Sequence, residues 1–305
     1  MTKGIVKAIP CIESVFMLDK EQDPLKIINV QTSWNKGYKG EGIAIAVLDS
    51  GIDSKHPDLV SRIIGGANFT EEDEGDFSNF ADYNGHGTHV AGIISSLNEN
   101  RETSVAPSAK LLIVKVLKRD GSGDLTHLIN GIYYAVNWRG TKDERVRVIC
   151  LSLGIPMKND ELYKAIKYAV EQGVLIVVAS GNQGTGDIED VNLLYPGAYN
   201  EVVQVGAVDG NEQIAQFSNL NNQMDILAPG VNILSTHLDK NYKRLSGTSM
   251  AAPFVAGAAG LLIENIESRL ERELSPNEIY AQLMKNTKNL GYPIKVEGNG
   301  LIYLI

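Results

Sequence analysis

Four runs of predominantly apolar residues, each as long as a β-strand, constrain the fold of this chain more than any other feature. They cover residues 43–48, 111–117, 146–151 and 174–179. Apolar residues without polar alternation are typical of strands buried on both faces of a parallel sheet. Segments 125–138 and 159–172 lie between these runs and are predicted to be helices. Strands that alternate with helices indicate an α/β fold.

The chain of 305 residues is expected to form one domain. This length suits one large α/β domain or two small ones, but no Pro- or Ser-rich linker, charge block or internal repeat divides the sequence. The net charge of −9 at pH 7 argues against nucleic acid and an anionic membrane as partners. Cys11 and Cys150 lie far apart in the sequence, which favours free thiols in a reducing compartment over a disulfide.

The first 18 residues indicate the compartment. They include Lys3 and Lys7 but have no unbroken apolar core and no cleavage site of small residues, so they do not resemble a signal peptide. We also expect no uncharged apolar run of membrane-spanning length. The sequence therefore predicts a cytoplasmic protein without a membrane partner.

The hydroxyl group of Ser249, which lies between small residues, is the first candidate catalytic group. The segment 247–253 places Ser249 just ahead of the apolar run 254–263, which is predicted to be a buried helix. In the first turn of a helix, unpaired N–H groups and the positive end of the dipole can stabilise an oxyanion. A serine at a helix start is more commonly only a cap, so this interpretation depends on partners elsewhere in the chain.

Two upstream segments supply such partners. The first apolar run ends at Asp49, and the carboxyl ends of parallel strands are where open α/β sheets place their sites. The Gly-rich segment 84–92 places His86 on the first turn of another apolar helix. An Asp, a His and a Ser are the groups that nucleophilic acyl transfer needs, because the imidazole takes the hydroxyl proton while the carboxylate fixes its tautomer.

Four strings carry a resemblance to the subtilisin family of serine proteases. They are Val-Leu-Asp-Ser-Gly-Ile-Asp at 47–53, His-Pro-Asp-Leu at 56–59, Gly-His-Gly-Thr-His-Val-Ala-Gly at 85–92 and Gly-Thr-Ser-Met-Ala-Ala-Pro at 247–253. The order Asp49, His86, Ser249 is the order known for the triad of subtilisin. The likeness extends from about Trp34 to about Tyr303. It implies a three-layer α/β fold, mainly a parallel sheet with helices on both faces, and a serine endopeptidase whose oxyanion-hole residue is Asn182.

The resemblance also implies how substrate is bound. Residues Gly121, Ser122 and Gly123 match one extended edge of the family's substrate cleft, and Ser152, Leu153 and Gly154 match the opposite edge. A substrate clamped as a strand between two edges must be an extended or unfolded polypeptide. Leu194 matches a position near the base of the primary specificity pocket where a smaller residue is common. We therefore expect a shallower apolar pocket that disfavours the largest aromatic side chains.

Without a signal peptide or a folded pro-domain, the chain resembles the intracellular subtilisins. The likeness predicts an N-terminal extension over residues 1–22 ahead of one catalytic domain over 23–305. In those proteins the extension lies across the active site, where a motif like Leu-Ile-Pro-Tyr blocks it until cleavage. The matching segment here, Ala8-Ile9-Pro10-Cys11, keeps the central Ile9 and Pro10. Proline has no N–H for strand pairing and could hold its peptide bond away from Ser249, although a disordered tail is the alternative.

The family resemblance makes Asp58 a calcium ligand, with Asn98 and Asn100 as the oxygen donors in the loop at 97–104. That loop is shorter than usual and contains Arg101, which counts against the site. The acidic run 71–76 is predicted to be a solvated loop. His89 lacks a zinc-binding spacing with His86 and is predicted to be a packed histidine.

These observations leave three functions open. The first is an intracellular serine endopeptidase that acts on unfolded polypeptides and is held inactive as a zymogen. The second is a dedicated cytoplasmic leader peptidase that matures one peptide. The third is a catalytically silent binding protein of the same fold. Relatives suggest a possible homodimer, and the apolar C-terminal end at 301–305 is expected to dock on the body of the protein or on a second copy.

Overall fold

A nine-stranded sheet forms the centre of the computed structural model, which describes residues 4–13, 23–97 and 103–305. Its strands, in order across the sheet, are β14 (Thr287–Lys288), β15 (Leu301–Ile302), β11 (Ile226–Pro229), β10 (Val203–Val208), β9 (Leu175–Ala179), β7 (Val146–Leu151), β3 (Ala44–Asp49), β5 (Lys110–Lys115) and β4 (Ile63–Asn68). All neighbours are parallel except β14 and β15. The four predicted strands are therefore confirmed as β3, β5, β7 and β9, side by side at the centre.

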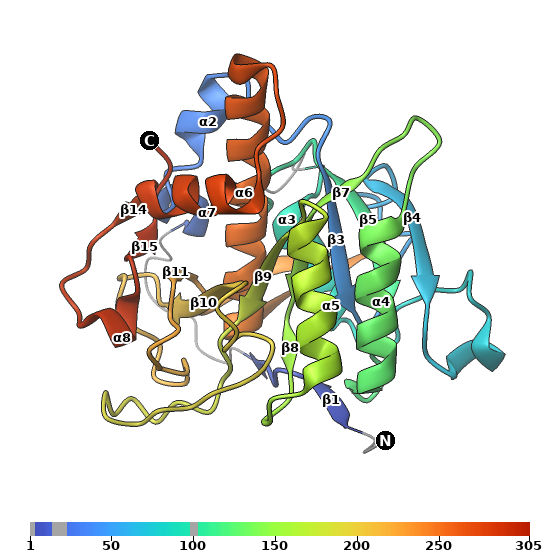
Figure 1. The fold of residues 1–305 in the computed structure, drawn as a ribbon, viewed down its shortest axis with the longest axis horizontal. Helices are drawn as coiled ribbons and strands as arrows, with labels where there is room; N and C mark the ends of the chain where they lie inside the picture. The colour runs from blue at the N-terminus through green and yellow to red at the C-terminus, as the bar shows by residue number, and fades with distance from the viewer. Residues whose placement is uncertain (1–3, 14–22, 98–102) are drawn as a thin grey trace.

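Helices cover both faces of this sheet (Figure 1). On one face α4 (Leu125–Asn137) and α5 (Asp160–Glu171) bury apolar residues against Ala46 and Leu48 of β3. On the other face α3 (His86–Ile94) and α6 (Thr248–Leu270) pack with Ile45 and Val47 of the same strand. Successive side chains of a strand point to opposite faces, so the apolar residues of this one strand supply both cores. The predicted three-layer α/β fold is confirmed.

The ends of the helices follow local sequence signals. The side chain of Asn159 caps α5 by accepting the N–H groups of Glu161 and Leu162 at 3.0 Å each. Ser275 and Glu278 form a capping box at the start of α7 (Pro276–Lys285), as the Ser-Pro-Asn-Glu sequence suggests. The remaining short helices are α1 (Pro24–Ile27), α2 (Gln31–Asn35), α8 (Ile294–Glu297), η1 (Glu72–Gly75) and η2 (Leu238–Lys240).

Helix α6 corrects one expectation. Among the described residues it is the single helix that is long and apolar enough, by length and composition, to cross a membrane. However, 83% of its apolar window is buried inside the fold. The core helix of a globular protein gives the same composition, because it is surrounded by protein on all sides.

Two small sheets flank the carboxyl ends of the central strands, and the N-terminal segment completes both. In the first, β1 (Ile5–Ala8) lies between β6 (Ser122–Asp124) and β8 (Leu153–Gly154) and is antiparallel to each. In the second, β2 (Ile12–Glu13) pairs with β13 (Asn241–Ser246), which also pairs with β12 (Ile233–His237). Residues 4–13 therefore form part of the folded structure.

The C-terminal end docks on the body of the same chain. Strand β15 joins the central sheet, and the Leu304 side chain is fully buried. The backbone N–H of Leu304 donates to the carbonyl of Ile28 at 2.9 Å. Of the two expected docking surfaces for residues 301–305, the protein's own body is therefore the one used, and the homodimer stays a prediction.

Candidate active site

Asp49 and His86 form a buried pair at the carboxyl edge of the sheet. Asp49 is the last residue of β3 and is 1% exposed. Its Oδ1 lies 2.7 Å from Nδ1 of His86, and the backbone N–H of Ser50 donates to the same oxygen at 2.7 Å. The carbonyl of Asp49 accepts the N–H groups of Val116 and Leu117 from the chain after β5, at 2.9 and 3.1 Å. Both the carboxylate and the backbone carbonyl of Asp49 accept hydrogen bonds, so the carboxylate has a fixed direction.

A glycine turn places His86 at the start of α3. Gly85 has a φ of 95°, in the left-handed region that favours glycine. A Cβ atom at Gly85 would also lie 2.4 Å from Nε2 of His237, so the position has no room for a side chain. The side chain of Asn84 accepts the N–H of His86 at 3.2 Å. The imidazole is therefore aimed at Asp49 by the geometry of the turn.

Asp82 organises this turn and was missed by the sequence analysis. Its carboxylate accepts the N–H groups of Asn84, Gly85 and Thr88 and the hydroxyls of Ser50 and Thr88, at 2.6 to 3.0 Å. Burial acts to raise the pKa of Asp82, but these hydrogen bonds outweigh it and the pKa is lowered. The available signal was an Asp shortly before a predicted helix, which is a cap pattern.

The pKa of His86 lies well above its usual value, although the ring is buried. Burial alone acts to lower this pKa, because it disfavours the charged form. The Asp49 carboxylate and then the Cys11 side chain raise it and outweigh the burial. Nε2, on the far side of the ring from Asp49, is buried and has no hydrogen-bond partner among the described residues. The ring is therefore placed to take up a proton at Nε2.

Ser249 lies at the start of α6, as predicted. It is the second residue of the helix, is fully buried, and follows the N-cap Gly247. Its Oγ lies 3.3 Å from the carbonyl oxygen of Ile9 and 3.4 Å from that of Ser152. The hydroxyl therefore faces the N-terminal segment of its own chain.

Asn182, which follows β9, makes hydrogen bonds at both ends of its side-chain amide. Its Oδ1 accepts both the N–H and the hydroxyl of Thr248 at 2.9 Å. Its Nδ2 donates to the carbonyl of Pro10 at 2.8 Å. Asn182 is therefore held next to Ser249 through Thr248, with Nδ2 directed at the N-terminal segment.

The N-terminal segment occupies both predicted substrate edges. In β1, Val6 pairs with Gly123 and Ala8 pairs with Leu153. The N–H of Ala8 donates to the carbonyl of Gly121 at 2.8 Å, and the N–H of Ile9 donates to that of Ser152 at 3.2 Å. The predicted edge residues Ser122 and Gly154 both pair with Lys7. A peptide strand can therefore bind between these edges, because one already does.

Leu194 lies at an apolar cavity of about 490 Å³, which Ile9 and Gly154 also line. A Cβ atom at Gly181 would lie 2.7 Å from Cδ1 of Leu194, so the leucine side chain fills the space beside that glycine. The Ile9 side chain is 2% exposed and belongs to the apolar core cluster against which Leu194 packs. This placement agrees with a pocket of reduced depth, which stays a prediction.

The calcium site lies only partly within the described structure. Asn98 and Asn100 fall outside the described residues. The carboxylate of Asp58 accepts a hydrogen bond from the hydroxyl of Tyr242, and its residue is 6% exposed. The described residues contain no cluster of three or more His, Cys, Asp or Glu side chains that could hold a metal. Calcium therefore stays a prediction from the resemblance.

His89 is packed, as predicted. It is fully buried, and its Nε2 lies 3.1 and 3.0 Å from the carbonyl oxygens of Ile233 and Lys243. Burial lowers the pKa of His89 to about 3, so the ring is neutral and donates from Nε2. It links α3 to the hairpin of β12 and β13.

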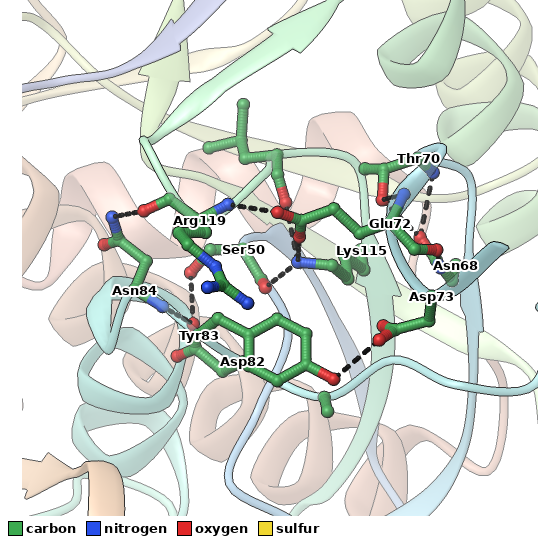
Figure 2. A network of polar contacts seen from close by, with 12 residues as sticks. Ser50, Asn68, Thr70, Glu72, Asp73, Asp82, Tyr83, Asn84, Lys115 and Arg119 are labelled. Carbon is green, nitrogen blue, oxygen red and sulfur yellow. Dashed lines mark hydrogen bonds and ion pairs between the residues drawn. The ribbon is translucent and has the colours of Figure 1, made fainter. Parts of the chain in front are cut away.

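The prediction of a solvated loop at 71–76 is wrong for Glu72. Its carboxylate lies 2.9 Å from Nζ of Lys115, which is fully buried (Figure 2). The same Nζ donates to the carbonyls of Ser50 and Leu117 at 2.7 and 3.0 Å. Glu72 also accepts the N–H of Arg119 at 3.0 Å. Lys115 therefore ties the end of β3, directly behind Asp49, to the end of β5.

Comparison with known proteins identifies the class. Residues 40–300 match the subtilase family, peptidase family S8. The chain belongs to the subtilase family and is a serine endopeptidase of the subtilisin type.

Three relatives show the degree of similarity. The chain is 49% identical to an intracellular serine protease of Paenibacillus polymyxa, over 92% of this chain and 84% of the relative. It is 46% identical to the major intracellular serine protease of Bacillus subtilis, over 99% of this chain and 94% of the relative. Subtilisin Savinase of Lederbergia lenta is 39% identical, over 90% of this chain and 94% of the relative.

Proposed function

We propose that this protein is an intracellular, cytoplasmic serine endopeptidase that hydrolyses extended or unfolded polypeptides with the triad Asp49, His86 and Ser249. The observation that carries the proposal is the buried 2.7 Å contact between Asp49 and His86, at the same edge of the sheet as Ser249. The names of its two intracellular relatives support the compartment.

Each group has one role in this proposal. His86 takes the hydroxyl proton of Ser249 at Nε2, and the Ser249 oxygen attacks the substrate carbonyl carbon. Asp49 stabilises the imidazolium that forms, because its carboxylate faces Nδ1. Nδ2 of Asn182 and the backbone N–H of Ser249 donate to the oxyanion. His86 then returns the proton to the leaving amine.

The N-terminal segment is proposed to inhibit the enzyme. It fills the substrate edges with β1, and Ile9 and Pro10 lie at Ser249 and Asn182. However, Ser249 contacts the carbonyl of Ile9, while Asn182 donates to the carbonyl of Pro10. The two groups thus contact carbonyl oxygens of successive residues, and this arrangement is proposed to protect the segment from cleavage.

The test compares cleavage of an unfolded protein by the full-length chain and by a chain that begins at Ile12. We expect low activity from the full chain, high activity from the shortened chain, and none from the shortened chain carrying Ser249→Ala. If the full-length and the shortened chain are equally active, the N-terminal segment does not inhibit the enzyme. If neither length cleaves but a phosphonylating reagent labels Ser249, the leader peptidase replaces this proposal. If Ser249 is also unlabelled, the silent binding protein replaces it.

A further inference from the structure

The thiol of Cys11 lies inside the proposed active site. Its Sγ is 3.5 Å from Sδ of Met250, the neighbour of Ser249, and 3.6 Å from the carbonyl oxygen of Ile9. A Cβ atom at Gly247 would lie 3.5 Å from the same sulfur. Cys11 follows Pro10 in the proposed inhibitory segment, so a change at this sulfur acts on the part of the segment nearest Ser249.

His86 provides a base beside this thiol. Its Nε2 is buried and without a hydrogen-bond partner among the described residues, and the ring is 6% exposed. Cys11 and His86 line the same cavity, and the Cys11 side chain acts, after Asp49, to raise the pKa of His86. The thiolate is the reactive form of cysteine, and a neighbouring imidazole is a group that generates it.

The other cysteine of the chain has the opposite surroundings. Cys150 lies within β7, is fully buried, and its pKa is raised, first by burial and then by the charge of Asp49. Cys11 is partly exposed. The protein therefore contains one accessible thiol next to a base and one inaccessible thiol, which serves as an internal control.

The cavity at Cys11 has room for a small reagent. It has a volume of about 410 Å³, and Cys11 and His86 are both among the residues that line it.

We propose that Cys11 is a thiol modification site which reacts with small disulfides and thereby releases the N-terminal segment from the active site. His86 takes the thiol proton at Nε2, and the Cys11 sulfur attacks one sulfur of the disulfide. A new S–S bond forms, the original S–S bond breaks, and the departing thiolate takes up the proton. The release step rests on the proposed inhibitory function of the segment.

Modification disturbs the contacts that Cys11 makes in the bound segment. The sulfur lies 3.5 Å from Sδ of Met250, and a group attached to the sulfur competes with this contact. Because Cys11 follows Pro10 directly, its displacement also pulls on the bond from Asn182 to the Pro10 carbonyl. A reducing agent that removes the group allows the segment to return.

The site is tested first in the Ser249→Ala protein, where the segment cannot be removed by self-cleavage. Glutathione disulfide is added, and peptide mapping by mass spectrometry follows the mixed disulfide at each cysteine. We expect modification of Cys11, none of Cys150, and a rate at Cys11 that falls about tenfold or more when His86→Ala is added. If Cys11 stays unmodified, or if its rate of modification does not depend on His86, Cys11 is not the proposed modification site.

The release is tested in the active full-length protein by the initial rate of peptide hydrolysis with and without glutathione disulfide. We expect a several-fold increase that dithiothreitol reverses and that Cys11→Ser abolishes. One outcome is modification of Cys11 without any change in the hydrolysis rate of the full-length protein. If the chain that begins at Ile12 is nevertheless more active, the proposed release is wrong and the inhibitory function stands. If that shortened chain is no more active than the full chain, the inhibitory function itself has failed.

Discussion

The hydroxyl of Ser249 and the side-chain amide of Asn182 contact two successive carbonyl oxygens of one segment, those of Ile9 and Pro10. In a productive complex both groups would act on the same carbonyl, the hydroxyl at its carbon and the amide at its oxygen. In the structure the two groups instead contact the carbonyl oxygens of successive residues. This difference leads to the first prediction.

Replacement of Pro10 by alanine should make the N-terminal segment a substrate. Proline fixes φ near about −65° and has no N–H, so Pro10→Ala gives the backbone freedom to move the Ile9 carbonyl toward Asn182. We expect faster conversion of the full-length chain to a shortened form, followed by mass spectrometry over time. Pro10→Ala combined with Ser249→Ala is the control and should stay intact. A Pro10→Ala chain as long-lived as the parent would contradict the role of the proline.

Removal of the Asn182 amide should slow catalysis more than binding. Asn182→Ala removes one oxyanion donor, which costs about 100- to 1,000-fold in kcat, a magnitude known from subtilisin. The measurement is kcat and KM of the chain that begins at Ile12, with a peptide substrate. Thr248→Val is a matched control, because it removes the hydroxyl bonded to Oδ1 of Asn182 while Nδ2 remains. A rise in KM with unchanged kcat would show that Asn182 acts only in binding.

The Cys11 side chain should raise the pKa of His86 in the blocked protein. Cys11→Ala in the Ser249→Ala background leaves Asp49 in place and removes one of the two groups that raise this pKa. We expect a lower His86 pKa in an NMR titration of the ring. A raised histidine pKa stabilises the folded state below the unfolded value of about 6.5, and this contribution is lost as pH rises through the folded pKa. An unchanged or higher pKa in Cys11→Ala would contradict the assignment.

Lys115 should contribute strongly to stability, because it has three partners and no exposed surface. Lys115→Met leaves the carboxylate of Glu72 and two carbonyls without this donor and should cost about 3 kcal/mol in the free energy of unfolding. Urea unfolding in the Ser249→Ala background measures it. Lys110, at the other end of β5, is the matched control, and Lys110→Met should change the free energy by less than about 0.5 kcal/mol. Equal effects of the two substitutions would contradict this account.

Leu194 should set the depth of the specificity pocket. Leu194→Gly removes the side chain that lines the cavity beside Ile9 and Gly154, so larger aromatic side chains should fit. We expect the ratio of kcat/KM for cleavage after Phe to that after Leu to increase in the chain that begins at Ile12. An unchanged ratio would show that Leu194 does not limit this pocket.

Features with a local sequence signal could be predicted. The four apolar runs gave the central strands because burial on both faces requires continuous apolar residues. Asp49, His86 and Ser249 could be selected because each lies at the end of a predicted element and matches a motif. The capping box at Ser275 was also a local pattern.

Features that depend on distant partners could not be predicted. Glu72 lies in an acidic run whose composition indicates solvent, and its contact with Lys115 exists only once β5 is in place. Ile5–Ala8 becomes a strand because β6 and β8 offer edges on both sides. The position of Cys11 could not be predicted either, because nothing in the sequence shows that its sulfur reaches Met250.

The attachment of β1 and β2 to the rest of the chain has a kinetic consequence. While the segment is covalently joined, it meets the cleft at an effective concentration on the order of millimolar. After one cut, the freed peptide is diluted to the concentration of the enzyme itself, which disfavours rebinding through so few hydrogen bonds. Proteolytic removal would therefore act as a one-way trigger, whereas reaction at Cys11 would be a reversible one in the same molecule.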